Sequence, residues 1–169
     1  TVPGCKAATA KGKVPVKVRQ PAATAKPTTK SLTLKTNCGD IVIEMFGSKA
    51  PVTVNAISAL ARGGYYNKSL CHRLTTEGIY VLQCGDPTLS GSGSPIGWQG
   101  YVDENLPANA AKNYPAGTVA MANSGPGVNG AGTNGSQFFL VFADTTLGAN
   151  YTIWGTITQG LDIVKAIAK

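Results

Sequence analysis

The chain has 169 residues, of which 43% are hydrophobic, and a formal net charge of +7 at neutral pH. This length suits a single domain, because most domains have about 100 to 200 residues. No stretch reaches the roughly 18 apolar residues that a membrane span requires, and the sequence begins at Thr1 without an apolar signal core, so we expect a soluble domain or the soluble part of a longer precursor. The single histidine, His72, excludes multi-histidine zinc and 2-His iron sites, and the cysteines form no C-x2-C pair, so we expect no metal ion.

The excess positive charge lies entirely in the first thirty residues. Residues 1–30 hold seven basic residues and no acidic residue, whereas residues 31–169 hold eight of each kind. A pI near 9.3 by itself suggests nucleic acid or an anionic surface as a partner. Because the remainder is formally neutral, we expect no nucleic-acid partner. Binding through the basic segment is an alternative, which deletion of residues 1–30 and salt-dependent binding would test.

Residues 1–30 are rich in Lys, Pro, Ala and Thr, the composition of an extended, solvated extension or linker that buries too little apolar surface to order itself. Within it, Val14, Val16 and Val18 alternate with Pro15 and a lysine. That period of two is typical of a strand, and a proline is tolerated only at the edge of a sheet. An edge strand is therefore an alternative for this short stretch.

From residue 31 onward, the pattern is one of short strands interrupted by two helices. Apolar runs bounded by Gly, Asn, Asp or Pro predict strands, and these cover residues 32–35, 41–46, 70–74, 80–84, 117–122, 137–142 and 151–157. Apolar residues three and four apart predict two amphipathic helices, over residues 50–62 and 160–169. Many short strands with two helices indicate an antiparallel barrel capped by helices.

The sequence lacks two widespread catalytic motifs, the G-x-S-x-G elbow of hydrolases and the G-x-x-x-x-G-K-[ST] phosphate loop. Its Gly-rich runs, residues 90–95 and 123–135, do not lie between a strand and a helix as phosphate-binding loops require. We interpret them as irregular loops that shape a groove. The remaining candidate for a functional site is a pair of neighbouring predicted strands that carry Arg73 and Gln83.

Four ordered motifs, two of them on these strands, are similar to those of a known family. They are His72-Arg73-Leu74, Val81-Leu82-Gln83-Cys84-Gly85-Asp86, Met121-Ala122-Asn123-Ser124-Gly125-Pro126 and Asn134-Gly135-Ser136-Gln137-Phe138-Phe139. Together they resemble the cyclophilin family of peptidyl-prolyl cis/trans isomerases over roughly residues 32–169. The number and order of the motifs make this resemblance highly specific.

The resemblance implies a site made of two catalytic residues and an apolar groove. Arg73 would be the catalytic arginine, and Gln83 would orient it. The implied substrate-binding residues are Tyr80, Val81, Ala122, Asn123, Phe139, Leu147 and Tyr151. His72 would face away from Arg73 and serve as a hydrogen-bonded packing residue, because successive residues of a strand point to opposite faces.

Several positions depart from the family's usual pattern. Tyr80 stands where the family usually has Phe, Val81 where it often has Met, and Tyr151 where many members have His. Thr146 replaces the tryptophan that lines the pocket in cyclosporin-sensitive members, since both tryptophans of this chain fall elsewhere. The resemblance therefore implies weak cyclosporin binding.

The family fold is mainly β, a closed antiparallel β-barrel of about eight strands capped by two α-helices. Members continue past the second helix into a final strand beside the first, whereas this chain stops at Lys169 within that helix. We therefore expect the last strand to be missing, unless another segment takes its place. The valine-rich stretch at 14–18 is the candidate for that place.

The implied function is that of an enzyme, a peptidyl-prolyl cis/trans isomerase that rotates X-Pro bonds in folding or client proteins. Selective binding of the twisted amide suffices for this reaction, so no cofactor is expected. The expected partners are proline-containing peptides and unfolded or client proteins, and the expected state is a monomer. A proline-peptide binding module with vestigial isomerase activity is the alternative, motivated by the departures at Tyr80, Val81 and Tyr151.

The four cysteines leave two alternatives open. Cys71 and Cys84 lie nearly symmetrically about the turn between their strands, so antiparallel pairing makes them neighbours, either in a disulfide or as two buried free thiols. Cys5 and Cys38 are left over, and pairing them would tie the extension to the first hairpin. Some exported or membrane-anchored bacterial cyclophilins resemble this layout, and four cysteines suit an oxidising, extracytoplasmic compartment, with the cytoplasm as the alternative.

Overall fold

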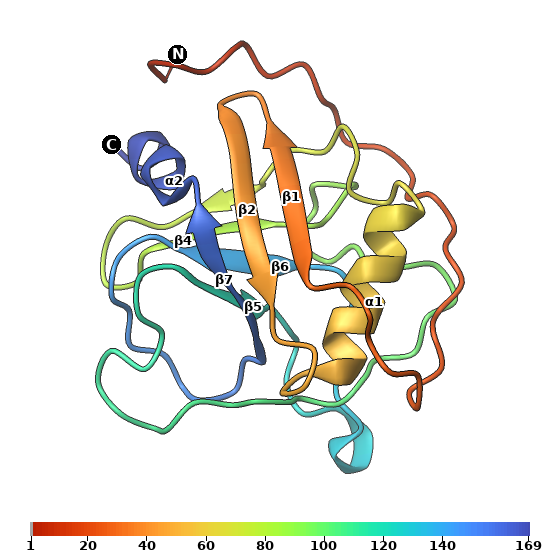
Figure 1. The fold of residues 1–169 in the computed structure, drawn as a ribbon. Helices are drawn as coiled ribbons and strands as arrows, with labels where there is room; N and C mark the ends of the chain where they lie inside the picture. The colour runs from red at the N-terminus through yellow and green to blue at the C-terminus, as the bar shows by residue number, and fades with distance from the viewer. Residues whose placement is uncertain (1) are drawn as a thin grey trace.

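The computed structural model describes residues 2–169, which are built around one antiparallel sheet and two helices (Figure 1). The sheet has seven strands in the order β1-β2-β7-β5-β6-β4-β3. The strands are β1 (Ser31–Thr36), β2 (Gly39–Met45), β3 (Arg73–Leu74), β4 (Val81–Cys84), β5 (Thr118–Met121), β6 (Phe138–Val141) and β7 (Ile153–Gln159). The helices are α1 (Pro51–Arg62) and α2 (Leu161–Ile167), with a short 3-10 helix η1 (Val128–Gly130). None of the helices within residues 2–169 is both long and apolar enough to cross a membrane.

The prediction of a mainly β fold with two helices is confirmed, and the sheet curls into a half-barrel. Its edges are β1 and β3, which do not pair with each other, so the expected closed ring of about eight strands is corrected to an open, curled sheet of seven. The alternative of an edge strand at 14–18 is wrong, since residues 2–30 form no strand and Val14 is 82% exposed. The backbone there bonds to a loop instead: the Lys13 N–H donates to the Pro87 carbonyl at 2.9 Å, and Pro15 has no N–H for a ladder.

Helix α1 begins where a proline and a distant carboxylate both favour a start. Pro51 lies in its first turn, where a missing N–H is tolerated. That turn has no acidic residue of its own. Glu104 supplies the negative charge, accepting hydrogen bonds from the N–H groups of Val52 at 3.3 Å and Thr53 at 2.8 Å. The loop that contains Glu104 is thereby fixed to the helix.

Strand β6 separates two buried clusters, because its successive side chains point to opposite faces of the sheet. Phe138 and Leu140 contact the main core, which also receives buried residues from both helices. Trp154 of β7 is fully buried there, with its ring centroid 5.7 Å from that of Phe138. Phe139 and Val141 belong to a second, smaller cluster. One strand therefore both stabilises the core and supplies the opposite face with side chains.

Residues 2–30, here called the N-terminal strap, run over the outside of the domain from the β1–β2 turn past α1 (Figure 1, red). A disulfide joins Cys5 to Cys38 in that turn. Further along, the indole N–H of Trp98 donates to the carbonyl of Val18 at 2.6 Å. A disulfide and polar contacts thus hold the strap against the domain. The composition of residues 1–30, which is that of a solvated linker, did not predict these contacts.

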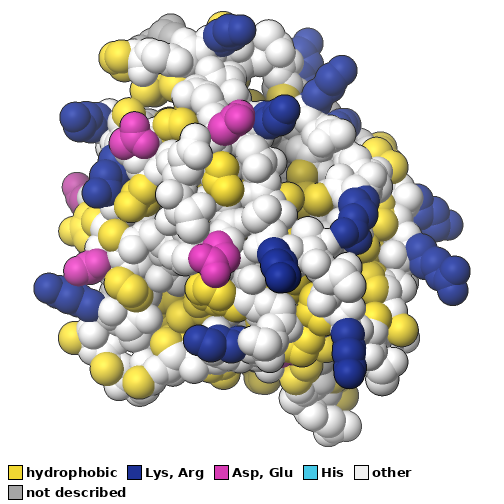
Figure 2. Space-filling model, in the orientation of Figure 1, with side chains coloured by type: hydrophobic (Ala, Val, Ile, Leu, Met, Phe, Trp, Pro, Cys, Tyr) yellow, Lys and Arg dark blue, Asp and Glu magenta, His cyan; other side chains and the backbone are white. Residues whose placement is uncertain are grey.

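The strap places the excess charge on one side of the molecule. It carries seven basic residues and no acidic residue. Figure 2 shows Lys and Arg side chains along the right-hand edge, where the strap passes, whereas the visible Asp and Glu side chains lie away from that edge. The net charge of +7 therefore corresponds to the seven basic residues of the strap, since residues 31–169 are formally neutral.

The second disulfide joins Cys71, two residues before β3, to Cys84, the last residue of β4. No free cysteine remains among residues 2–169, so the disulfide alternative is the one formed at both pairs. Because β3 has only two residues, few backbone hydrogen bonds attach it to the sheet. The disulfide is therefore a principal link between β3 and β4.

Replacing both Cys71 and Cys84 with serine is expected to lower the free energy of unfolding by about 3 kcal/mol, because a cross-link across about 14 residues restricts the unfolded chain by that amount. Urea unfolding of the oxidised proteins measures the difference. As a control, reductant should destabilise the wild-type protein more than the variant. A thiol titration of the wild-type protein in denaturant, without reductant, should find no free thiol, and finding four would contradict both disulfides.

Candidate active site

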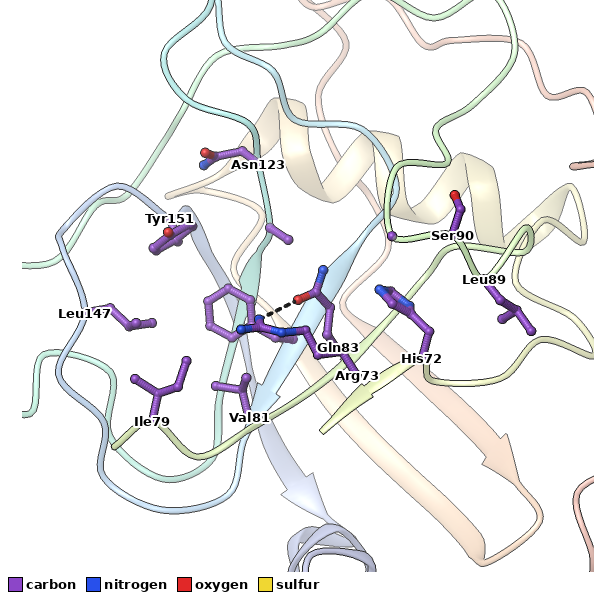
Figure 3. Close-up of a pocket in the computed structure, with 13 residues that line it drawn as sticks. His72, Arg73, Ile79, Val81, Gln83, Leu89, Ser90, Asn123, Leu147 and Tyr151 are labelled. Carbon is purple, nitrogen blue, oxygen red and sulfur yellow. Dashed lines mark hydrogen bonds between the residues drawn. The ribbon is translucent and has the colours of Figure 1, made fainter. Parts of the chain in front are cut away.

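A groove of about 560 Å³ opens on the face of the sheet that carries the second buried cluster (Figure 3). Elements far apart in the chain contribute to it, namely β3, β4, β6 and segments that follow β4 and β5 and precede β7. Eight of the nine site residues expected from the sequence line it, and these are Arg73, Val81, Gln83, Ala122, Asn123, Phe139, Leu147 and Tyr151. The fold thus gathers into one groove residues that the motifs only list in order.

Arg73 begins β3 and stands directly opposite Gln83 of β4. Its Nη1 donates a hydrogen bond to Oε1 of Gln83 at 3.2 Å. Arg73 is exposed at the rim, whereas Gln83 is half-buried. The cross-strand pairing, the neighbouring disulfide and this hydrogen bond together hold the guanidinium over the groove.

Gln137 lies behind Gln83 and has no role in the expectations from sequence. Nε2 of Gln83 donates to Oε1 of Gln137 at 2.9 Å. Nε2 of Gln137 in turn donates to the carbonyls of Gly91 at 2.9 Å and Gly93 at 3.0 Å. These bonds fix both amides, so that Oε1 of Gln83 faces Arg73. The sequence could not predict this role, because a hydrogen bond between side chains of different strands leaves no sequence pattern. The only available signal is that Gln137 belongs to the 134–139 motif.

The carboxylate of Asp86 organises the loop that follows β4, and it is fully buried. It accepts hydrogen bonds from the N–H groups of Thr88, Gly91 and Gly93 at 2.9, 2.7 and 3.1 Å, and from the Thr88 hydroxyl at 2.6 Å. Burial raises the pKa of this carboxyl, but the hydrogen bonds outweigh it and lower the pKa below its ordinary value. Residue 93 must be glycine here, because a Cβ atom would collide with Oδ1 of Asp86.

The floor of the groove is apolar. Val81 and Phe139 are almost fully buried in the second cluster, and Leu147 packs against it. The Tyr151 ring stands at the side, with its centroid 5.6 Å from that of Phe139. Beneath, the Tyr114 hydroxyl donates to the Tyr151 carbonyl at 2.8 Å and accepts from its N–H at 3.0 Å. Burial raises the pKa of Tyr114 to about 12, against the lowering effect of its bond to the Tyr151 backbone, so this phenol stays neutral at physiological pH.

Ala122 and Asn123 continue from β5 along the rim of the groove. The Ala122 N–H donates to the Gln137 carbonyl at 3.0 Å. The Asn123 side chain is engaged at both ends: Nδ2 donates to the Asn150 carbonyl at 2.8 Å, and Oδ1 accepts from the Gly125 N–H at 3.0 Å. These bonds fix the position of both residues at the rim of the groove.

Tyr80 is the one expected site residue that does not line the groove. Its ring packs against the main core, with its centroid 6.0 Å from that of Phe142. Tyr80 precedes β4, and its ring lies on the core side although its neighbour Val81 lines the groove. Ile79 lines the groove in its place. The assignment of Tyr80 to substrate binding is therefore corrected.

His72 lines the groove beside Arg73, so the expectation that it faces away as a hydrogen-bonded packing residue is wrong. The alternation on which that expectation rested applies within a strand, and β3 begins only at Arg73. Nδ1 of His72 is buried and has no hydrogen-bond partner among residues 2–169.

Charged side chains are sparse around the groove, and tryptophan does not line it. Arg73 is the only Lys or Arg among its lining residues, which include no Asp, Glu or Trp. Trp154 lies in the main core and Trp98 against the strap. Thr146 is exposed outside the groove, where its hydroxyl accepts from the Lys112 N–H at 2.8 Å. Within residues 2–169, no group of three or more His, Cys, Asp or Glu is placed to hold a metal ion.

The chain is similar to known proteins over most of its length. The family described as "Cyclophilin type peptidyl-prolyl cis-trans isomerase/CLD" matches residues 31–169. Two relatives named "Probable peptidyl-prolyl cis-trans isomerase B" come from Mycobacterium leprae, 44% identical over 153 residues, and Mycobacterium tuberculosis, 42% identical over 153 residues. Each match covers 85% of this chain and, respectively, 50% and 48% of the relative. The chain therefore spans about half the length of these two relatives.

Other relatives have lengths closer to that of this chain. "Peptidyl-prolyl cis-trans isomerase-like 1" of Bos taurus is 40% identical over 136 residues, which are 79% of this chain and 76% of the relative. A crystal structure of a cyclophilin type peptidyl-prolyl cis-trans isomerase of Cryptosporidium parvum aligns with a TM-score of 0.71 and 29% identity, covering 83% of this chain and 84% of that one. The same protein was also solved in the presence of the dipeptide Ala-Pro. On the family match, the relatives and the shared fold, the chain belongs to the cyclophilin type peptidyl-prolyl cis-trans isomerase family.

Proposed function

We propose that this protein catalyses cis/trans isomerisation of X-Pro bonds in proline-containing peptides and in unfolded or client proteins. The observation that supports this best is the Arg73 guanidinium, bonded to Gln83 and held over an apolar floor that includes Phe139. NMR exchange spectroscopy on a blocked peptide containing Ala-Pro tests the proposal. Catalytic amounts of protein should speed an exchange that takes tens to hundreds of seconds unaided, and no acceleration would contradict the proposal.

The reaction needs a placed cation and an apolar pocket rather than a nucleophile. The planar X-Pro amide is held by resonance, which gives a rotation barrier of about 18–20 kcal/mol. As the bond twists, the prolyl nitrogen loses conjugation and its lone pair becomes available to a donor. Arg73 donates to that nitrogen and favours the twisted amide over the planar one, while Gln83 and Gln137 hold the guanidinium in place. The apolar floor grips the proline ring, so the other side of the bond rotates.

Peptide binding follows from the same groove. We propose that the edge formed by Ala122 and Asn123 binds the substrate backbone, and that Val81, Phe139 and Leu147 contact the proline ring. The Cryptosporidium parvum relative solved in the presence of Ala-Pro is consistent with this. A binding module with vestigial activity is less favoured, because the hydrogen bond that orients Arg73 is intact. Turnover compared with peptide affinity distinguishes the two.

Cyclosporin is expected to bind weakly. Thr146, the residue aligned with the tryptophan of cyclosporin-sensitive members, is outside the groove, and neither tryptophan of the chain lines it. Without an indole at the rim, the ligand loses a large aromatic contact. Titration of the protein with cyclosporin should therefore give at most micromolar affinity, and a nanomolar dissociation constant would overturn this expectation.

We also propose that residues 31–169 form the isomerase domain and that the protein is a monomer that works in an oxidising, extracytoplasmic compartment. Two disulfides support that location, because such bonds persist where thiols are not kept reduced. Purification from an oxidising and a reducing compartment of an expression host, followed by thiol counting, tests the compartment. Sedimentation tests the oligomeric state.

A further inference from the structure

The groove extends beyond the part assigned to the proline ring. In Figure 3, Arg73 and Gln83 lie at its centre and the apolar floor lies to one side of them. To the other side lie His72, Leu89 and Ser90, which also line the groove. None of these three belongs to the residues expected to bind substrate. A peptide that reaches the apolar floor would continue toward them.

Leu89 is held in an unusual backbone conformation. Its φ of +63° lies in the left-handed region, which a leucine rarely adopts. The Leu89 N–H donates to the Asp86 carbonyl at 3.0 Å, and the Asp86 carboxylate fixes the next turn through the Gly91 N–H at 2.7 Å. Strained residues of this kind persist where the surroundings determine them, often at ligand sites. The loop therefore presents the Leu89 side chain in a defined position.

The N-terminal strap holds the same loop from the outside. The Lys13 N–H donates to the Pro87 carbonyl at 2.9 Å. Gly12 passes so close that a Cβ atom on it would lie 3.0 Å from the Thr88 carbonyl oxygen and 3.7 Å from Cδ1 of Leu89. The strap thus supports this wall of the groove, and it is anchored before this point by the Cys5 disulfide.

The chemistry of this wall favours an aliphatic side chain. The Ser90 hydroxyl is already bonded to its neighbours in the loop, at 2.9 Å to the Thr88 hydroxyl and 3.0 Å to the Ser92 hydroxyl. Nδ1 of His72 is buried. These residues therefore present the Leu89 side chain beside the half-buried imidazole of His72 and a serine hydroxyl that is already bonded.

We propose that His72, Leu89 and Ser90 form a second subsite, which binds an aliphatic side chain flanking the X-Pro bond of the same peptide, and that Gly12 and Lys13 of the strap hold this subsite in shape. The proposal rests on the proposed function for its substrate. Its consequence is substrate selectivity, set in part by a segment outside the 31–169 domain.

The test compares three blocked peptides, Gly-Ala-Pro-Gly, Leu-Ala-Pro-Gly and Gly-Ala-Pro-Leu, by NMR exchange. The wild-type protein should show a kcat/KM about fivefold or more higher for one leucine peptide than for the glycine peptide, as expected for partial burial of an aliphatic side chain. Lys13→Pro removes the N–H that bonds to Pro87 and should bring that ratio toward one. Lys13→Ala keeps this N–H and is the matched control, for which the ratio should stay at the wild-type value.

Leu89→Asn provides a second variant, independent of the strap. Asparagine tolerates the left-handed conformation but removes the aliphatic surface, so the ratio should again fall toward one. An equal loss of activity on all three peptides, or an unchanged ratio in both Lys13→Pro and Leu89→Asn, would overturn the subsite. If the wild-type protein turns over none of the peptides, the proposed function fails instead. The subsite is then tested by calorimetric titration, in which the dissociation constants of the leucine and glycine peptides are compared in the same way.

Discussion

Replacing Arg73 with alanine is expected to lower kcat/KM on an X-Pro peptide at least about tenfold, which corresponds to about 1.4 kcal/mol of transition-state stabilisation. Among residues 2–169, Arg73 is the only Lys or Arg side chain that lines the groove, and without it this cation cannot donate to the prolyl nitrogen as the bond twists. Because Arg73 is exposed and lies at a sheet edge, the fold should survive the change. A protease-coupled assay measures the turnover, and circular dichroism checks the fold.

Two further variants make this result specific. Arg62→Ala removes another exposed arginine, at the end of α1 and outside the groove, and should leave turnover at the wild-type level. Arg73→Lys keeps the positive charge but loses the planar guanidinium, which can bond to Gln83 and face the groove at the same time. Turnover should therefore lie between that of Arg73→Ala and that of the wild type. Wild-type turnover in Arg73→Ala would mean that the proposed mechanism is wrong.

Asp86→Asn is expected to lower the free energy of unfolding by about 2–4 kcal/mol. The carboxylate is fully buried and accepts hydrogen bonds from the Thr88, Gly91 and Gly93 N–H groups. In asparagine, an NH2 group replaces one carboxylate oxygen and faces N–H groups that are also donors. At least one of these hydrogen bonds is therefore lost, and a buried polar group is left unsatisfied. Urea unfolding at neutral pH measures the change. Asp40→Asn, at an exposed position of β2, is the control and should change stability little.

The same carboxylate predicts a pH dependence of stability. Its pKa is lower in the folded protein than in the unfolded chain, so its stabilising contribution is fully present above the unfolded pKa of about 3.9. As pH falls below that value toward the folded pKa, the contribution is progressively lost. Urea midpoints measured between about pH 6 and pH 2.5 should fall less steeply with acidification in Asp86→Asn than in the wild type. Identical slopes would show that Asp86 makes no such contribution.

Local patterns in the sequence were enough to predict the strands and both α-helices, but not the 3-10 helix η1. The 41–46 apolar run and the 50–62 amphipathic pattern correspond to β2 and α1 within a residue or two, because hydrophobic periodicity and turn residues act over a few positions. The 70–74 strand is shortened to β3, Arg73–Leu74. The motifs that carry Arg73 and Gln83 also indicated their pairing, since two strands joined by a short turn have a nearly fixed register.

The tertiary structure alone decided how the site is completed. It placed Tyr80 in the core and His72 in the groove, because each lies just outside a strand, where alternation does not fix the direction of a side chain. It brought Gln137 behind Gln83, and the strap against the loop next to Leu89. These contacts join residues far apart in the chain, and their geometry depends on how the whole sheet curls. The sequence by itself therefore determined the strands, the helices and the arginine, whereas long-range packing and hydrogen bonding decided what positions that arginine and which walls form the groove.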